Sequence, residues 1–350
     1  MGSPPILAVL AVIVAKALVV IVVLLTAFAY MTWLERRLIS RFQVRIGPNR
    51  VGPFGLMQPL ADGIKLFFKE DFVPAGADKV LYYLAPGLAM VTAFTAFAVI
   101  PFGPPDVQLF GVPLFQISNP NAGILFVLAV TSIGIYGIIL GGWSSNSKYS
   151  LLGALRSSAQ LISYELGVGL AIVGVVLLAG TLQLPEIVKE QSGFFFGFLP
   201  RWNIFVQPLG FLLLLIGATA ETNRPPFDLP ESEQELVAGF HTEYGGMKFA
   251  AFFVAEYVNV ITASGVATTL FLGGWQGPFV DQFPILGPLW FVVKIFAFAF
   301  FFIWIRATLP RIRYDQLMDV GWKLLVPLAL LNLAITSVIV LIWPSLGGGS

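Results

Sequence analysis

Long apolar stretches constrain this chain more than any other feature of its sequence. A membrane-spanning helix needs roughly 20 apolar residues to cross about 30 Å of hydrocarbon. Only 11% of the residues are charged and 57% are hydrophobic, which leaves too few polar side chains to cover a water-facing surface. We therefore predict an all-α, polytopic membrane protein, a single membrane domain over 1–350 with about eight transmembrane helices. The eight stretches lie at about residues 6–33, 80–102, 119–142, 159–180, 203–220, 248–273, 285–306 and 324–343.

Missing residue types exclude several kinds of chemistry. There is no cysteine and only one histidine, His241, so iron–sulfur ligation, thiolate zinc sites and a bis-histidine haem are excluded within this chain. No glycine-rich nucleotide-binding motif occurs, and a net charge of +1 argues against nucleic-acid binding. We predict no metal site and no cofactor bound by this chain alone. The first stretch is too long for a cleavable signal peptide and is expected to remain a span.

The distribution of basic residues predicts the orientation in the membrane. Sixteen of the twenty lysines and arginines lie in or at the ends of four alternate loops, and only two lie in the loops on the opposite side. Because cytoplasmic loops carry the excess of basic residues, we expect these four loops to face the cytoplasm and both termini to face outward, in a bacterial cell (inner) membrane. They include the 34–79 loop, an acidic loop at 221–247 and a basic loop at 306–323.

The 34–79 loop is too patterned to be a simple connector. Its apolar residues recur at helical spacing, at Leu60, Ile64, Phe67 and Phe68. The opposite face carries Asp62, Lys65 and Lys69. This pattern predicts a short amphipathic helix that lies in the membrane interface. Arg37, Arg41 and Arg45 are spaced to form a stripe along a helical extension of the first span.

Charges inside the predicted spans are the strongest pointers to function, because each costs at least a few kcal/mol to insert. They are Lys16, Glu165, Glu256 and Lys294. Each glutamate adjoins a tyrosine and lies near a cytoplasmic helix end, where a carboxyl group can exchange protons and serve in a relay. The alternative is an ion pair between one glutamate and Lys294. For Lys16, packing or snorkelling toward polar surroundings is as good an interpretation as function.

Two cytoplasmic loops carry further charge. The 221–247 loop holds Glu221, Asp228, Glu231, Glu233, Glu235 and Glu243 against few basic residues, and its prolines stiffen the backbone. It could attract protons toward the span glutamates, dock a basic partner, or be an ordinary solvated loop. Arg306, Arg311 and Arg313 close the seventh span, where they could bind lipid headgroups or contact a partner or ligand.

Several long motifs resemble one known family. They are Glu35-Arg36-Arg37, the run from Gln43 to Pro53, the run from Gln58 to Lys65, Ser163-Tyr164-Glu165, the run from Glu221 to Glu231, Glu243-Tyr244, Ala255-Glu256-Tyr257, and Trp304-Ile305-Arg306 leading to the run from Arg311 to Leu317. These look like the membrane subunit of respiratory complex I at its junction with the peripheral arm, which is called the H subunit in bacteria and subunit 1 in mitochondria. The motifs extend from about residue 35 to 320.

The resemblance implies a subunit of a proton-pumping NADH:quinone oxidoreductase that has no activity alone. Such a subunit forms the floor and portal of the quinone chamber, contacts lipid and antiporter-like membrane subunits, and binds peripheral-arm subunits, which carry FMN and iron–sulfur clusters. The resemblance assigns to the chamber and portal Glu35, Arg36, Arg45, Asp62, Lys65, Phe227 and Arg306. It assigns to the proton path Glu165, Glu221, Asp228, Glu231, Glu233, Glu235, Glu243, Glu256 and Tyr257. Some bacterial relatives have a glutamate where this sequence has Ser132, so a four-glutamate path is not expected.

Two other functions are compatible with such a sequence. The first is an anchor and ion-coupling subunit of a membrane-bound hydrogenase related to complex I, which would bind no quinone. The second is a secondary transporter that acts alone. The first-loop and acidic-loop motifs favour the complex I subunit over both.

Overall fold

The structure, a computed structural model, describes residues 6–195, 199–229, 236–280 and 282–342. Almost all regular structure in these residues is helical. The strands among them form two short antiparallel hairpins, β1 (Gln108–Leu109) with β2 (Val112–Pro113), and β3 (Phe194–Phe195) with β4 (Leu199–Pro200). The prediction of an all-α protein is confirmed.

Seven helical segments in the described ranges are long and apolar enough to cross a membrane. The last of them is continuous from Tyr314 to Ile342 and consists of α12 (Tyr314–Asp319), the π-helical η3 (Val320–Leu325) and α13 (Val326–Ile342). This number and the absence of any sizeable sheet in the described residues confirm a polytopic membrane protein. The other six are α1 (Ile6–Phe42), α3 (Lys79–Phe97), α4 (Gly123–Ser144), α5 (Lys148–Ala179), α10 (Gly246–Phe271) and α11 (Leu286–Thr308).

The predicted span at 203–220 is not one continuous helix. It consists of α7 (Asn203–Val206) and α8 (Pro208–Glu221), which are separated at Gln207. Proline restricts the residue before it to non-helical backbone angles, and Gln207 has φ −128° and ψ 62°. The 14 residues of α8 rise about 21 Å at 1.5 Å per residue, less than the thickness of the hydrocarbon layer. Glu221 therefore ends a short helix inside the bundle.

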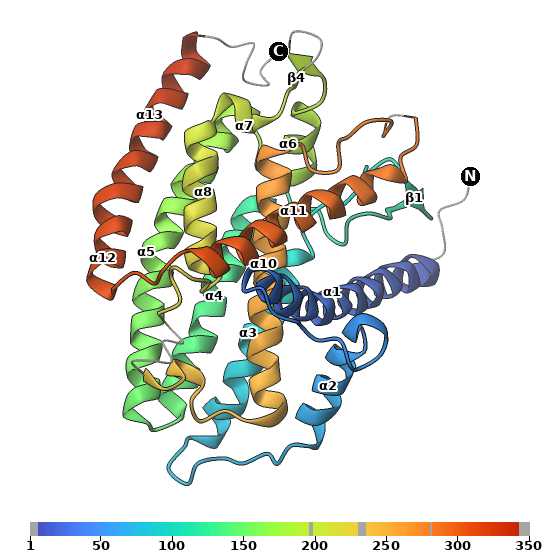
Figure 1. Cartoon of the computed structure of the whole chain (residues 1–350). Coiled ribbons are helices and arrows are strands. Elements are labelled where there is room, and N and C mark those ends of the chain that lie inside the picture. The colour runs from blue at the N-terminus through green and yellow to red at the C-terminus, as the bar shows by residue number, and fades with distance from the viewer. Residues whose placement is uncertain (1–5, 196–198, 230–235, 281, 343–350) are drawn as a thin grey trace.

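The spans have two orientations (Figure 1). Helices α3, α4, α5, α8, α10 and α13 run up and down in the view, whereas α1 and α11 run across it, over α10. Contacts among α1, α10 and α11 join the two groups. The shorter elements outside these spans are η1 (Pro53–Gly55), α2 (Gln58–Phe68), α6 (Leu184–Glu190) and η2 (Gly239–His241).

The amphipathic helix predicted in the 34–79 loop is present as α2, which packs beside α1. The arginine stripe is only partly realised. Helix α1 continues beyond the predicted span as far as Phe42, so it includes Arg37 and Arg41 but not Arg45. Val44 has a positive φ of 54°, and the chain turns away there.

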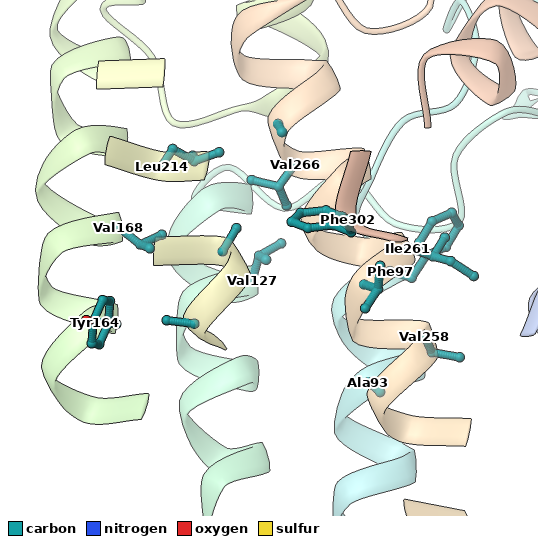
Figure 2. Packing of buried hydrophobic residues seen from close by; sticks show 14 of the residues in the cluster. Ala93, Phe97, Val127, Tyr164, Val168, Leu214, Val258, Ile261, Val266 and Phe302 are labelled. Atoms are coloured by element: carbon teal, nitrogen blue, oxygen red, sulfur yellow. The ribbon is translucent and has the colours of Figure 1, made fainter. Parts of the chain in front are cut away.

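Small residues let the vertical helices approach closely. Between α3 and α4, a Cβ added at Gly137 would lie 2.9 Å from the Cβ of Ala89 and 3.0 Å from the carbonyl oxygen of Ala85. Such small residues favour helix packing in membranes, where dispersion contacts replace the hydrophobic effect. Figure 2 shows side chains from several helices meeting in this core, among them Val168 of α5 and Leu214 of α8.

The two lysines inside the spans bind main-chain carbonyls. Lys16 Nζ donates to the carbonyl oxygens of Pro113 and Gln116, both at 2.8 Å. Lys294 Nζ donates to three carbonyl oxygens just beyond the C-terminal end of α10, at 2.6 to 2.9 Å. The alternative that Lys294 pairs with a span glutamate is wrong, because its three donors are used at the end of α10 remote from Glu256. The long stem of Lys16 thus brings its ammonium group to polar main-chain partners.

Candidate functional site

A cluster of buried charges lies where α1, α10 and α11 meet the loop after α8. Arg224 Nη1 lies 3.1 Å from Glu35 Oε2, and Arg224 Nε lies 3.2 Å from Glu256 Oε1. The Tyr257 hydroxyl donates to Glu35 Oε2 at 2.8 Å, and Arg306 Nη1 donates to Glu35 Oε1. Arg224 thus bridges two carboxylates that come from different helices.

Burial makes these ion pairs necessary, because an unpaired charge inside the protein is costly. The side chains of Arg224 and Glu35 are 4% and 6% exposed. Burial alone would lower the pKa of Arg224, but the neighbouring carboxylates of Glu256 and Glu35 raise it above its ordinary value. The guanidinium also lies 4.3 Å from the centre of the Tyr257 ring. Arg224 therefore stays charged, and it offsets the cost of burying two carboxylates.

A second ion pair fixes the loop beside this cluster. Arg311 Nη2 lies 2.7 Å from Asp228 Oδ2, and burial raises the pKa of Asp228 while Arg311 opposes the rise. Gln160 of α5 donates to the carbonyl oxygens of Ala220 and Phe227 at 2.9 and 2.8 Å. Gln160 thus ties both the end of α8 and the loop at Phe227 to α5, and Arg311 ties the loop to the segment after α11. With this second pair included, the charge cluster contains three acids and three arginines, namely Glu35, Asp228, Glu256, Arg224, Arg306 and Arg311.

An internal cavity of about 60 Å³ lies among α3, α4, α5, α8 and α10. Three glutamates line it, Glu165, Glu221 and Glu256, and we call it the glutamate cavity. Its volume is enough for water, which needs at least about 10–15 Å³ and polar partners. The other polar residues that line it are Thr92, Thr131, Thr222, Asn223, His241 and Asn259.

Two further observations define the surroundings of this cavity. Ser132 Oγ of α4 donates to Glu165 Oε1 of α5, so this serine is a hydrogen-bond partner of one of the cavity glutamates. A smaller cavity of about 40 Å³ is also lined by Glu221 and Asn259, and it extends between apolar residues of α4, α5 and α8. Glu221 therefore borders both spaces.

Glu256 belongs to both the charge cluster and the glutamate cavity. It pairs with Arg224 on one side and lines the cavity on the other, and its side chain is 17% exposed. The structure thus brings together two sets that the sequence could only name separately. Glu35, Arg306, Glu256 and Tyr257 meet in the cluster, and Glu165, Glu221 and Glu256 meet in the cavity.

Other predicted residues lie elsewhere. Asp62 of α2 pairs with Arg36 of α1 at 2.7 Å and lies 3.8 Å from Lys65. This pair lies beside an open apolar groove of about 630 Å³ between α1 and α2, lined by residues that include Tyr30, Leu60, Ile64 and Phe67.

The remaining predicted residues fall into four sets. Arg45 is exposed and donates to Gln43, away from the cluster, because α1 ends before it. Phe227 packs its ring 5.3 Å from that of Tyr164. The main-chain carbonyl of Glu243 accepts the Tyr82 hydroxyl at 2.6 Å, and Glu243 does not line the glutamate cavity. Three predicted residues, Glu231, Glu233 and Glu235, lie outside the described residues.

Sequence reasoning missed some residues of the site. From the sequence, Arg224 was treated only as one of the basic residues of its loop, although Arg224 bridges Glu35 and Glu256. Asn259 carried a usable signal, because it follows Glu256 by three residues and so shares its helix face. His241 served only to exclude metal sites, yet it lines the cavity.

Together the fold and the site define a polytopic helical membrane protein in which one carboxylate joins a buried ion cluster to an internal polar cavity. A family profile described as NADH dehydrogenase matches residues 15–337. The chain is 59% identical to the second of the NADH-quinone oxidoreductase H subunits of Geobacter sulfurreducens, over 92% of this chain and 94% of the relative. It is 56% identical to the NADH-quinone oxidoreductase H subunit of Thermomicrobium roseum, over 91% and 92%. The chain therefore belongs to the H-subunit family of NADH-quinone oxidoreductase, an enzyme complex.

Proposed function

We propose that this chain is the membrane subunit of a proton-pumping NADH:quinone oxidoreductase that forms the quinone portal and chamber floor. In this role it couples quinone reduction to proton translocation through its buried glutamates. Membership of the H-subunit family supports the assignment to the complex and argues against a hydrogenase anchor or a lone transporter. Its partners are then the peripheral-arm subunits at the quinone site and other membrane subunits, including antiporter-like ones.

The position of Glu256 is the single observation that carries the coupling role. Its carboxylate lies within 3.2 Å of Arg224, which also binds Glu35, and it lines the cavity that Glu165 and Glu221 share. A change of charge near Glu35 alters the pairing of Arg224, and through Arg224 it alters the charge balance at Glu256. Protonation of Glu256 then affects the two other glutamates across a space that is large enough for water.

The groove between α1 and α2 supports the portal. Its lining is almost wholly apolar and suits an isoprenoid tail, and it is open on one side. The Arg36–Asp62 pair joins the two helices beside it and offers polar groups to a quinone headgroup. Electrons reach the quinone from FMN and iron–sulfur clusters in partner subunits, which agrees with the lack of cysteine ligands in this chain.

The proposed orientation has the 34–79, 221–247 and 306–323 loops in the cytoplasm and both termini outward, in the bacterial cell membrane. The ends of α3, α4, α5 and α10 that border three of the basic loops lie together at the lower side of Figure 1. Their grouping on one side supports the distribution of basic residues as a guide to topology.

Glutamine substitutions in the assembled complex test the coupling role. Glu256→Gln and Glu165→Gln remove a proton-binding group with little change of shape, and we expect both to lower the rates of quinone reduction and proton pumping. Glu186→Gln is the matched control, because Glu186 is about half-exposed and, among the described residues, forms an ion pair with Lys189 of the same helix, α6. Normal rates of both reactions in the Glu165 and Glu256 variants would refute the proposal.

The composition of the native complex tests the assignment itself. After mild detergent extraction, mass spectrometry should identify a flavin subunit that oxidises NADH among the partners. A nickel-containing subunit in its place would assign the chain to a hydrogenase instead.

A further inference from the structure

The only histidine of the chain, His241, belongs to the 221–247 loop and lines the glutamate cavity. His241 ends η2, which packs against α4 and α5. The approach to α5 is close: a Cβ added at Gly153 would lie 2.7 Å from the main-chain nitrogen of Phe240. The sequence thus provides a glycine where η2 meets α5, and the main chain at His241 is held in place.

The ring of His241 is also held by its neighbours. It makes edge contacts with the rings of Phe240 and Phe249, at centroid distances of 4.9 and 5.3 Å. These aromatic contacts orient the ring without using its nitrogens. The imidazole has no hydrogen-bond partner within the part of the chain that the structure describes, and His241 lines the glutamate cavity.

The charged groups around His241 are mostly acids. Helices α5, α8 and α10 contribute Glu165, Glu221 and Glu256 to the lining of the cavity, whereas α3 and α4 contribute no ionisable residue. The cation Arg224 contacts Glu256 from outside this lining. His241 is therefore the one basic side chain among the described residues that line the cavity.

The chemistry of a neutral imidazole suits this position. Burial lowers the pKa of His241 to about 4, so the ring is uncharged at neutral pH. A neutral imidazole has one nitrogen that accepts a hydrogen bond and one that donates. The ring can therefore accept a proton on one nitrogen and release another from the second, as a purely packed phenylalanine cannot.

We infer that His241 is a proton-transfer residue that connects the 221–247 loop to the glutamates of the cavity. In one transfer, water on the loop side gives a proton to the unprotonated ring nitrogen. The other nitrogen releases its proton to cavity water, which protonates a glutamate carboxylate. A 180° flip of the ring about its Cβ–Cγ bond then brings the remaining N–H back to the cavity side, and one proton has moved. This inference rests on the proposed function, because it assigns a route to the same glutamates.

Substitution in the assembled complex, reconstituted in liposomes, tests the inference. His241→Gln keeps a polar side chain of similar size but removes the two ring nitrogens, one of which accepts a proton while the other releases one. A positioned acid–base group contributes typically 10²–10⁴-fold, and water takes over part of the transfer, so we expect coupled turnover to fall by roughly tenfold or more. We also expect the solvent deuterium isotope effect on turnover to rise, because proton delivery becomes rate-limiting.

A second variant separates proton transfer from packing. Incorporation of an Nε2-methylated histidine at position 241 keeps the aromatic ring and its contacts but blocks one nitrogen, and it should reproduce the loss seen in His241→Gln. Phe249→Leu is the structural control, since it loosens the ring contact without removing a proton carrier. It should leave the isotope effect unchanged. If the methylated ring turns over at the normal rate, His241 is a packing residue only.

The same assays distinguish this inference from the proposed function. If Glu165→Gln and Glu256→Gln lower pumping while both His241 variants behave like the wild type, only the role of His241 is refuted. If the glutamate variants are also normal, the coupling role of the cavity fails as a whole.

Discussion

Removing Arg224, the cation at the centre of the charge cluster, should leave the buried carboxylate of Glu256 without an ion-pair partner in the described part of the chain. In Arg224→Met the apolar stem is roughly retained, but Glu35 and Glu256 lose ion pairs of 3.1 and 3.2 Å. At an effective dielectric constant near 20, each pair is worth about 5 kcal/mol before desolvation is subtracted. Glu35 keeps Arg306 as a partner, whereas Glu256 has no second ion pair among the described residues. Breaking a buried pair from one side typically costs about 3–5 kcal/mol, and we expect a loss in this range.

The double variant Arg224→Met, Glu256→Gln shows whether the stranded charge causes the loss. It restores equal numbers of acids and arginines in the cluster and leaves no unpaired carboxylate. The double variant should therefore be more stable than the single variant by at least about 1 kcal/mol, which lies within the range of interaction energies between residues in contact. The assay is thermal dissociation of the purified complex, followed on native gels.

Arg313→Met is the matched control for this pair of variants. Arg313 pairs with Asp315 on the surface, with side chains 75% and 68% exposed, and its loss should change stability by less than about 0.5 kcal/mol. Equal midpoints for the single and double variants would refute the argument that Glu256 depends on Arg224.

Three further predictions concern separate parts of the molecule. The pKa of His241 is lowered to about 4 from an ordinary value near 6.5, so the unfolded chain binds one more proton between these pH values. The uncharged His241 therefore contributes fully to the stability of the folded chain above pH 6.5, and this contribution falls by roughly 3 kcal/mol as the pH drops to 4. In His241→Gln the dissociation midpoint should depend less on pH in this range. Gly153→Ala places a methyl group against the main chain of Phe240 and should cost about 1–3 kcal/mol, measured by the same dissociation assay. Gly63 has open space around its α-carbon in the α1–α2 groove, so Gly63→Trp should raise KM for a long-tailed quinone more than for a tailless one, while Gly63→Ala should change neither.

Much of the fold followed from the sequence because a bilayer leaves few alternatives. Backbone groups in hydrocarbon must be paired within a helix, so an apolar stretch of sufficient length predicts a span. Helix α2 was located by a different signal, the helical spacing of Leu60, Ile64 and Phe67 opposite a polar face. The break before α8 was missed because the apolar pattern continues through Pro208, while only the restricted backbone of Gln207 interrupts the helix.

The candidate site was predictable in part. Glu165 and Glu256 were identified because a charge within an apolar run is costly and therefore conspicuous. Their partners were not, since pairing depends on which loops fold over the helix ends. Arg224 lies 189 residues from Glu35 in the chain, and no local pattern joins them. The alternative that Lys294 pairs with a span glutamate is wrong for a related reason, because carbonyl oxygens just beyond the end of α10 bind its ammonium group instead.

The geometry of α10 explains how one helix can serve two environments. Residues three apart share a helix face, so Glu256 and Asn259 both line the glutamate cavity. Tyr257 and Val260 lie on the neighbouring face, where Tyr257 binds Glu35 and Val260 packs beside the cluster. Because these residues belong to the same helical turn, α10 cannot rotate or shift so as to alter the contacts of Glu35 without also moving the Glu256 carboxylate within the cavity. The proposed coupling between the two environments therefore needs no long chain of intermediates, because Arg224 contacts both carboxylates directly.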